Sequence, residues 1–288
     1  MKELVYISTS CLRGGRDLFK TLEKYVESGI KNIELGSSHL YTPNIEKKVS
    51  EFQNSNKVKF VVHNYFPPRE DNLILNLASP NENIREKSID HAKTALDLCE
   101  TLGSRFYAIH AGFILDPDKG FKFSGTPLPY ERSYEIFISS LREIIPYAEE
   151  KGVNFAVENN TSSSTQAGFV GDYLLMQKPD EFETMFRELN EFNEFGVLLD
   201  VGHLNVASKW YKFNKEIFIN TLYDHILGLH LHENDGNADT HQNIRKDSWF
   251  LEKIVRKKAG KVPMTLESGN LSIKEILESK KILESYLK

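Results

Sequence analysis

Leu198-Leu199-Asp200 and Thr265-Leu266-Glu267 are two of seven short apolar segments in this chain that end on a histidine, aspartate or glutamate. The others are Asn32-Ile33-Glu34, Val61-Val62-His63, Ala108-Ile109-His110, Ala156-Val157-Glu158 and Leu229-His230-Leu231-His232. A short apolar run rich in β-favouring residues and bounded by turn formers is typical of a buried strand. Strands that end in this way place their last side chains at one rim of a parallel sheet. That is the catalytic face of a (β/α)8 barrel.

Strand-like and helix-like segments alternate along the rest of the chain. We expect strands over residues 4–8, 31–35, 59–63, 105–110, 153–158, 196–200, 226–231 and 262–267. We expect helices over residues 16–28, 45–53, 83–102, 133–151 and 273–286. Several of these helices are followed by glycine, as at Gly29, Gly103 and Gly152, which is a common helix end. The sequence therefore predicts an α/β protein, a (β/α)8 TIM barrel, with one domain over residues 1–288.

Composition limits the class of protein. Of the 288 residues, 40% are hydrophobic and 27% are charged, and no apolar stretch approaches the about 18 residues of a membrane helix. We therefore expect no membrane association, and we expect a cytoplasmic protein because no signal-peptide pattern is present. The two cysteines, Cys11 and Cys99, are too few for a disulfide framework. A net charge of −5 gives no sign of nucleic-acid binding, and the oligomeric state stays open.

The predicted loops are longest on one side of the barrel. Those after the third, fourth, fifth and seventh strands are long, whereas the connections from a helix to the next strand are short. Long loops in a compact domain usually serve binding or catalysis. Their position supports an active-site face at the strand ends.

The ligand types at the strand ends point to a metal. Glu158, Asp200, His232 and Glu267 end four consecutive predicted strands, and their oxygen and nitrogen donors suit zinc or manganese. One such acid alone is more often a helix cap or a surface charge. Several carboxylates that meet at one rim without a cation would repel one another, so the combined pattern favours a divalent ion.

Further histidines and acids accompany this set. His63 and His110 end the neighbouring strands, so they are either hydrogen-bonded core histidines or ligands of a second ion. Asp200 and His203 form one more acid–histidine pair. Asp239 and His241 form another, which an extended loop would turn to the same side, although a polar surface loop is the alternative. His230 lies two residues before His232 on the same face of the strand. We expect it to contact a metal ligand and orient that ligand without binding the metal itself.

These segments resemble the xylose isomerase-like barrel superfamily, and within it the endonuclease IV family of zinc-dependent DNA repair enzymes. The resemblance covers residues 59 to 269. Its most specific parts are Asn76-Leu77-Ala78-Ser79-Pro80, Arg85-Glu86-Lys87-Ser88, Val157-Glu158-Asn159, Leu199-Asp200-Val201-Gly202-His203, His232-Glu233-Asn234-Asp235, Asp239-Thr240-His241 and Leu266-Glu267-Ser268.

The resemblance implies up to three zinc ions held by nine side chains. His63 and His110 would bind one ion, with Glu158 bridging to a second. Asp200, His232 and Glu267 would complete the second, and His203, Asp239 and His241 would hold the third. Glu34, Asn64, Tyr65, Asn159, His230 and Asn234 are expected to support these ligands or to contact the substrate.

The chain departs from the repair enzymes where those enzymes contact DNA. The first strand ends in Ile7-Ser8-Thr9-Ser10-Cys11 instead of a Gly-Ala-His-Val-Ser type segment. The loop after the second strand lacks the DNA-probing arginine. It reads Glu34-Leu35-Gly36-Ser37-Ser38-His39, closer to the sugar isomerase and epimerase branch. The metal set thus resembles the repair family, whereas the DNA-reading set does not.

Three readings of function follow. The first is a phosphoester hydrolase of the endonuclease IV type, possible substrates being DNA or a small phosphorylated molecule, in which Glu158 and Glu267 position or deprotonate a metal-activated water. The second is a sugar or sugar-phosphate isomerase or epimerase, in which the same two glutamates move a proton. The third is a barrel that binds a metal or sugar without turnover. An isomerase needs only Glu158, Asp200, His232 and Glu267, so the additional ligands favour the hydrolase.

Overall fold

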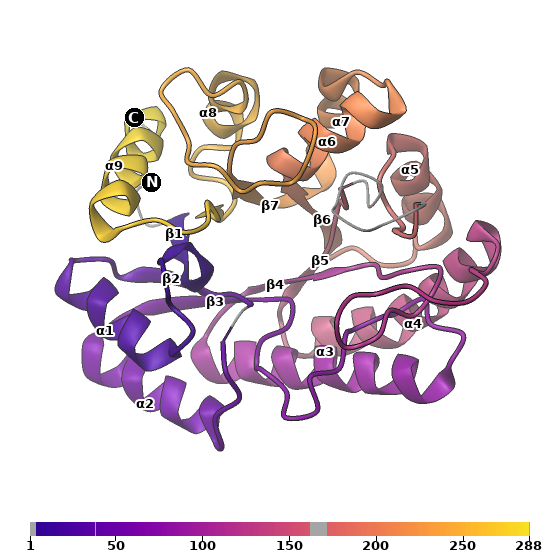
Figure 1. Cartoon of the computed structure of the whole chain (residues 1–288), viewed down its shortest axis with the longest axis horizontal. Coiled ribbons are helices and arrows are strands. Elements are labelled where there is room, and N and C mark those ends of the chain that lie inside the picture. The colour runs from indigo at the N-terminus through magenta and orange to yellow at the C-terminus, as the bar shows by residue number, and fades with distance from the viewer. Residues whose placement is uncertain (1–3, 38, 162–171, 288) are drawn as a thin grey trace.

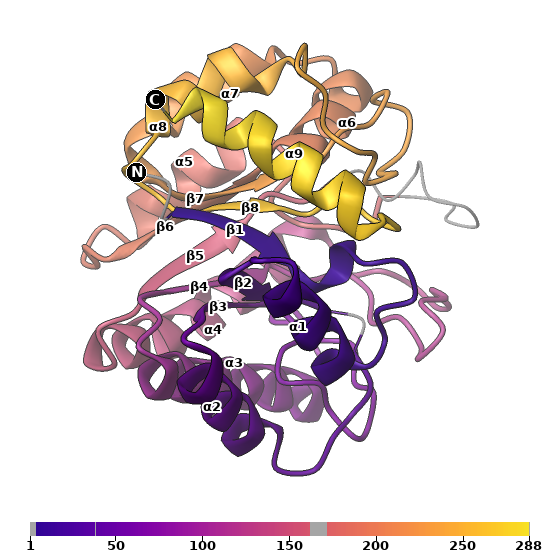
Figure 2. The same ribbon diagram turned by 90° about the vertical axis from the view of Figure 1, so that its left-hand side faces the viewer.

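Eight parallel strands close into a barrel in the computed structural model, which describes residues 4–37, 39–161 and 172–287. Each strand pairs in parallel with the next one along the chain, and the last pairs with the first, with Tyr6 opposite Thr265. Figure 1 shows α1 to α4 on one side of the strands and α5 to α9 on the other, and Figure 2 shows the same arrangement from the side. The predicted fold class is confirmed.

The strands lie where alternation and apolar runs predicted them. Their bounds are β1 (Val5–Ser8), β2 (Asn32–Leu35), β3 (Lys59–His63), β4 (Phe106–His110), β5 (Asn154–Glu158), β6 (Phe195–Asp200), β7 (Ile226–Leu231) and β8 (Met264–Leu266). The last strand is shorter than the predicted 262–267, so Glu267 stands just beyond its end. Strands that are buried on both faces read as continuous apolar runs, which is why the sequence located them well.

The helices around the barrel have the following bounds: α1 (Leu18–Glu27), α2 (Ile45–Asn56), α3 (Glu82–Leu102), α4 (Tyr130–Glu150), α5 (Pro179–Glu188), α6 (Val201–Tyr211), α7 (Lys215–Thr221), α8 (Arg256–Lys258) and α9 (Ile273–Tyr286). The five predicted helices correspond to α1 to α4 and α9. The sequence analysis did not predict α5 to α8. Most residues of α6 are buried, from Val201 to Ser208, so that helix has no polar face to give an amphipathic pattern.

Side chains that point into the barrel change from apolar to polar along β4, β5 and β6. At the lower level Phe106, Ala108, Ala156 and Leu198 pack together in a small core of their own. Successive inward positions are two residues apart, so Ala108 is followed by His110, Ala156 by Glu158, and Leu198 by Asp200. Apolar side chains therefore fill the barrel interior below the carboxyl ends of the strands, and the potential metal ligands form the next layer towards those ends.

Long segments follow β3, β4, β5 and β7, as the sequence predicted, and they all leave from the carboxyl ends of the strands. Part of the segment after β5 lies outside the described residues. Among the helices that the structure describes, none combines the length and the apolar character that crossing a membrane requires. The fold thus places an enlarged rim around the layer of acids and histidines.

Candidate metal centre

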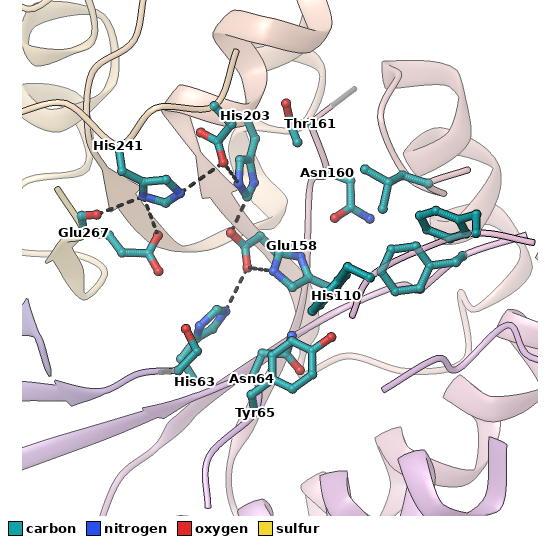
Figure 3. Close-up of a pocket in the computed structure, with 17 residues that line it drawn as sticks. His63, Asn64, Tyr65, His110, Glu158, Asn160, Thr161, His203, His241 and Glu267 are labelled. Atoms are coloured by element: carbon teal, nitrogen blue, oxygen red, sulfur yellow. Dashed lines mark hydrogen bonds and ion pairs between the residues drawn. The ribbon is translucent and has the colours of Figure 1, made fainter. Parts of the chain in front are cut away.

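Glu158 at the end of β5 lies at the centre of the site (Figure 3). Its side chain is 1% exposed, and Oε2 lies 2.8 Å from Nε2 of His63 and 3.4 Å from Nε2 of His110. The other oxygen, Oε1, lies 3.4 Å from Nδ1 of His203. The parallel pairing of β3, β4 and β5 aligns their ends and produces this contact. His63, His110 and Glu158 therefore form the group predicted for one ion.

A second group of donors lies deeper in the barrel. Glu158, Asp200 and Glu267 meet there as predicted, with ligand atoms within 4.8 Å of one another, but their histidine partner is His230. His230 and His232 face the same side of β7, and His230 is the lower of the two. Nε2 of His232 nevertheless lies 3.1 Å from Oδ2 of Asp200, so this ring touches the second group from above.

The third group contains both acid–histidine pairs. Oδ2 of Asp239 lies 3.2 Å from Nε2 of His203 and 3.0 Å from Nε2 of His241. His232 joins this group, and its ring stacks on that of His241 with centroids 3.9 Å apart. Asp239 and His241 do face each other, but the extended loop from which this was expected is not present. His241 has a left-handed backbone with φ of 44°.

Asp200 joins two elements at this rim. Helix α6 begins directly after β6, and Oδ1 of Asp200 accepts a hydrogen bond of 2.7 Å from the backbone N–H of His203. This is an N-cap contact, which stabilises the helix start and fixes the carboxylate. One oxygen of Asp200 thus caps α6 while the other faces His232.

The donor set suits divalent cations. It combines imidazole nitrogens with carboxylate oxygens, the ligands that zinc prefers and that manganese also accepts. Four buried atoms in the set have no hydrogen-bond partner: Nδ1 of His110, Nδ1 of His230, Nδ1 of His232 and Oδ1 of Asp239. Buried polar atoms are rarely left unpaired, so these atoms and the close carboxylates are consistent with bound cations.

Charges inside the cluster shift its titration. Burial disfavours the charged form of His241, but the hydrogen bond to Asp239 outweighs it and raises the pKa of His241 to about 10. Burial also tends to lower the pKa of His203. The negative charges of Asp200 and Asp239 outweigh this and raise the pKa of His203 well above its ordinary value. Burial would raise the pKa of Glu158, yet the histidines His110 and His63 hold it well below its usual range. Without metal, protonated histidines offset the carboxylates.

Zinc binding is accordingly expected to release protons. At pH 7 His203 and His241 carry protons in the metal-free protein, and only neutral imidazole binds a metal, so about one to two protons should leave per loaded chain. Affinity should therefore rise with pH from 6 to 9. Calorimetry in two buffers of different ionisation enthalpy measures the release. His241→Ala should lower it, and a release near zero in the wild type would contradict these protonation states.

Asn159, Asn234 and Glu34 support the ligands. Oδ1 of Asn159 accepts from the backbone N–H of Asp200 at 2.8 Å, and Nδ2 donates to the carbonyl of the same residue at 3.0 Å. Nδ2 of Asn234 donates to the carbonyl of Gly202 at 2.9 Å. Oε2 of Glu34 lies 2.8 Å from Nε2 of His230, whose Nδ1 lies 3.0 Å from Oε2 of Glu267. These side chains hold ligand-bearing segments in place.

Gly202 gives His232 the space to reach this cluster. A Cβ at position 202 would lie 2.0 Å from Cε1 and 2.5 Å from Nδ1 of His232. Gly202→Ala should displace that ring and weaken zinc binding by about 10- to 100-fold, the usual effect of disturbing a ligand's surroundings. Zinc titration against a competing chelator measures this. In the matched control Gly269→Ala, the new Cβ would lie 3.6 Å from Cβ of His241, and equal affinities of the two variants would show that the contact is unimportant.

A pocket opens beside the ligands, with a volume of about 260 Å³. Asn64 and Tyr65, which the sequence analysis singled out, line it. The pocket also contains residues that sequence reasoning missed, namely Asn160, Thr161, Phe113, Phe121, Phe123 and Leu174. Asn160 and Thr161 directly follow Glu158-Asn159 and could have been found from that position. The aromatic residues belong to the segment after β4, where no motif marked them.

Comparison with known proteins places the chain among related barrels. The family described as "Xylose isomerase-like TIM barrel" matches residues 22–284. "Uncharacterized protein MJ1311" of Methanocaldococcus jannaschii is 25% identical over 273 residues, which cover 94% of this chain and 85% of the relative. "Probable endonuclease 4" of Sulfurihydrogenibium sp. (strain YO3AOP1) is 27% identical over 221 residues, which cover 72% of this chain and 70% of the relative.

Solved structures show the same fold. A D-tagatose 3-epimerase-like protein superposes with a TM-score of 0.73 and 24% identity, over 98% of this chain and 96% of the other. D-psicose 3-epimerase from Clostridium cellulolyticum H10 superposes with a TM-score of 0.66 and 16% identity, over 98% of this chain and 95% of the other. At these identities the likeness concerns the fold.

Proposed function

This chain belongs to the xylose isomerase-like TIM barrel family, and from that premise we propose that it is a metal-dependent phosphoester hydrolase that uses up to three zinc ions. The single observation that carries the proposal is the number of ligand-type side chains that meet at the rim. His63, His110, Asp239 and His241 lie against the four strand-end ligands that a sugar isomerase would need. The relatives named endonuclease 4 support the same reading.

The chain's own residues have defined tasks in this proposal. Divalent ions held by the three groups would supply Lewis acidity, which neutralises charge on a phosphate ester and makes water more acidic. Glu158 and Glu267 both line the pocket, where they would orient the attacking water and accept its proton. Tyr65, which also lines the pocket, would contact the ester.

A sugar or sugar-phosphate isomerase or epimerase is the second candidate. The observation that favours it is the acid at the end of β2, because Glu34 reaches the barrel interior and contacts His230. In this reaction Glu158 and Glu267 would remove and return a proton at the carbon between two sugar oxygens. It would leave His63, His110, Asp239 and His241 without a role.

Duplex DNA is not the substrate that we propose. A protein that binds several backbone phosphates of DNA needs lysine or arginine side chains near its site that are not already paired with carboxylates. Arg69 forms hydrogen bonds to Asp71 with both Nε and Nη2 at 2.8 Å, and Arg245 lies 3.4 Å from Asp247. Among the described residues that line the pocket, none is lysine or arginine. We therefore propose a small phosphorylated substrate.

One side-by-side assay tests this function. Zinc-loaded protein is given small phosphomonoesters and diesters, an abasic DNA duplex, and ketoses or their phosphates as isomerase substrates. We expect zinc-dependent release of phosphate or alcohol from the small esters and much slower cleavage of the duplex. The salt slope of duplex binding should be shallower than about −3, which corresponds to about three phosphate contacts. Sugar isomerisation without ester hydrolysis would overturn the proposal, and efficient salt-sensitive duplex cleavage would contradict the choice of substrate.

A further inference from the structure

We propose that the pocket beside the metal centre binds a flat, uncharged aromatic ring, so that the substrate is a nucleotide or an aryl phosphate and not a bare sugar phosphate. This inference rests on the proposed phosphoester hydrolysis and specifies its substrate class. Three observations support it: the aromatic wall of the pocket, unpaired polar atoms of two lining residues outside the metal ligands, and the absence of lysine and arginine among the described lining residues.

The wall opposite the metal ligands is aromatic. Phe113, Phe121 and Phe123 line the pocket from the segment between β4 and α4, and Leu174 adds an aliphatic side chain. The ring centroids of Phe113 and Phe123 lie 5.5 Å apart, and those of Phe113 and Phe121 lie 6.4 Å apart. Phe121 is 45% exposed, which is unusual for so large an apolar side chain. A ring that stacks on this wall would remove apolar surface from water.

Hydrogen bonds with Asn76 fix the backbone of Phe113 in this wall. Asn76 is buried, and its Oδ1 accepts from the N–H of Phe113 at 2.9 Å and from that of Ala78 at 3.0 Å. Its Nδ2 donates to the carbonyl of Phe113 at 3.0 Å and to Oδ1 of Asp116 at 2.6 Å. The ring of Phe123 stacks on Tyr173 with centroids 4.4 Å apart and planes 12° apart. A wall that is fixed before binding costs little conformational entropy when a ligand arrives.

Two residues that line the pocket and lie outside the metal ligands have a buried polar atom without a partner. Oδ1 of Asn64 and Oγ1 of Thr161 are buried, their residues are 1% and 5% exposed, and neither atom makes a hydrogen bond. Figure 3 shows these two side chains on different sides of His110. Buried polar atoms of this kind are normally paired, so a ligand that pairs them is favoured. A nucleobase offers ring N–H and carbonyl groups at its edge, whereas a simple aryl ring does not.

The charges of the pocket confine the phosphate to the metal centre. The described residues that line the pocket include no lysine or arginine, and the sequence of residues 162–171 contains none either. A second phosphate group would thus meet no lysine or arginine among the described residues that line the pocket. The volume of about 260 Å³ lies just below the about 300–1,000 Å³ of most ligand pockets, which favours a small ligand such as a mononucleotide or an aryl ester.

Binding measurements on the zinc-loaded protein test this inference. The probes are thymidine 5′-monophosphate, phenyl phosphate and ribose 5-phosphate, and Kd is measured by calorimetry under conditions in which turnover is undetectable or corrected. We expect the two ring-bearing probes to bind at least about 10-fold more tightly than ribose 5-phosphate, because a ring gains this much from stacking on an aromatic side chain. Phe123→Leu should remove most of this preference and leave the Kd of ribose 5-phosphate unchanged.

Matched variants separate the possible outcomes. Phe52→Leu changes the same residue type outside the pocket and should preserve the preference, and zinc content confirms that each variant is loaded. Asn64→Ala should weaken thymidine 5′-monophosphate and spare phenyl phosphate if the ring is a nucleobase. Equal weakening of both probes, or of neither, would contradict a hydrogen bond from Asn64 to the edge of a nucleobase.

These binding measurements can fail or succeed independently of the proposed hydrolase activity. Equal affinity for all three probes, or binding of none at millimolar concentration, would overturn the inference even if the protein hydrolyses esters. A ring preference in a protein that hydrolyses no ester would overturn the proposed function and leave the aromatic site in place.

Discussion

Replacing Glu158 by glutamine is expected to reduce phosphoester hydrolysis by about 100-fold or more with little loss of stability. Loss of a group that only supports a metal ligand already costs about 10- to 100-fold, and Glu158 is central to two of the donor groups. A neutral amide cannot balance two cations, and it cannot accept a proton from water. Glutamine has the shape of glutamate, so the buried position should still be filled.

The measurement combines initial rates, zinc content and thermal unfolding. Glu150→Gln is the matched control, because Glu150 ends α4, directly before β5, and is exposed. The control should retain wild-type activity. Full activity of Glu158→Gln with zinc still bound would remove this residue from the mechanism.

Replacing Asp239 by asparagine should cause the second largest loss and should distinguish the two candidate reactions. Asp239 contacts His203 and His241 through one oxygen, so its charge holds the third group together. If three ions take part in hydrolysis, Asp239→Asn should lower the rate by about 100-fold, comparable to the loss of other electrostatic stabilisers. If the protein is an isomerase, the four strand-end ligands suffice and its rate should hardly change.

Rates on a small phosphoester and on a ketose, measured with the same preparations, decide between these outcomes. Asp235→Asn serves as the control, because Asp235 lies in the same loop, is exposed and contacts Asn237 away from the ligands. Equal ester hydrolysis by Asp239→Asn and by the control would exclude a role for the third group.

The barrel and the layer of ligands could be predicted from the sequence because both depend on local pattern. A parallel strand buried on both faces is a continuous apolar run, and its carboxyl end must reach the rim. Glu158, Asp200 and Glu267 therefore had to approach one another once the strands closed. The pairing of His203 with Asp239 followed from the family resemblance, since nothing in the sequence fixes the path of the loop after β7.

Other features depend on contacts that no local pattern records. His230 and His232 have the same periodicity, and only the packed barrel shows that His230 lies with Glu158 and Glu267. Helix α6 is buried on most sides and has no amphipathic signal. The position of Phe113 in the aromatic wall depends on hydrogen bonds with Asn76, which is distant in the sequence.

Zinc stoichiometry tests the central claim most directly. Purified chain, loaded with zinc and freed of excess ions, is analysed by elemental mass spectrometry beside Asp239→Asn. We predict about three ions per wild-type chain, which is the number that the proposed trinuclear centre requires, and about two for the variant, which lacks one carboxylate of the group with His203 and His241. One ion per chain in both proteins would contradict the trinuclear centre and support the single-metal chemistry of a sugar isomerase.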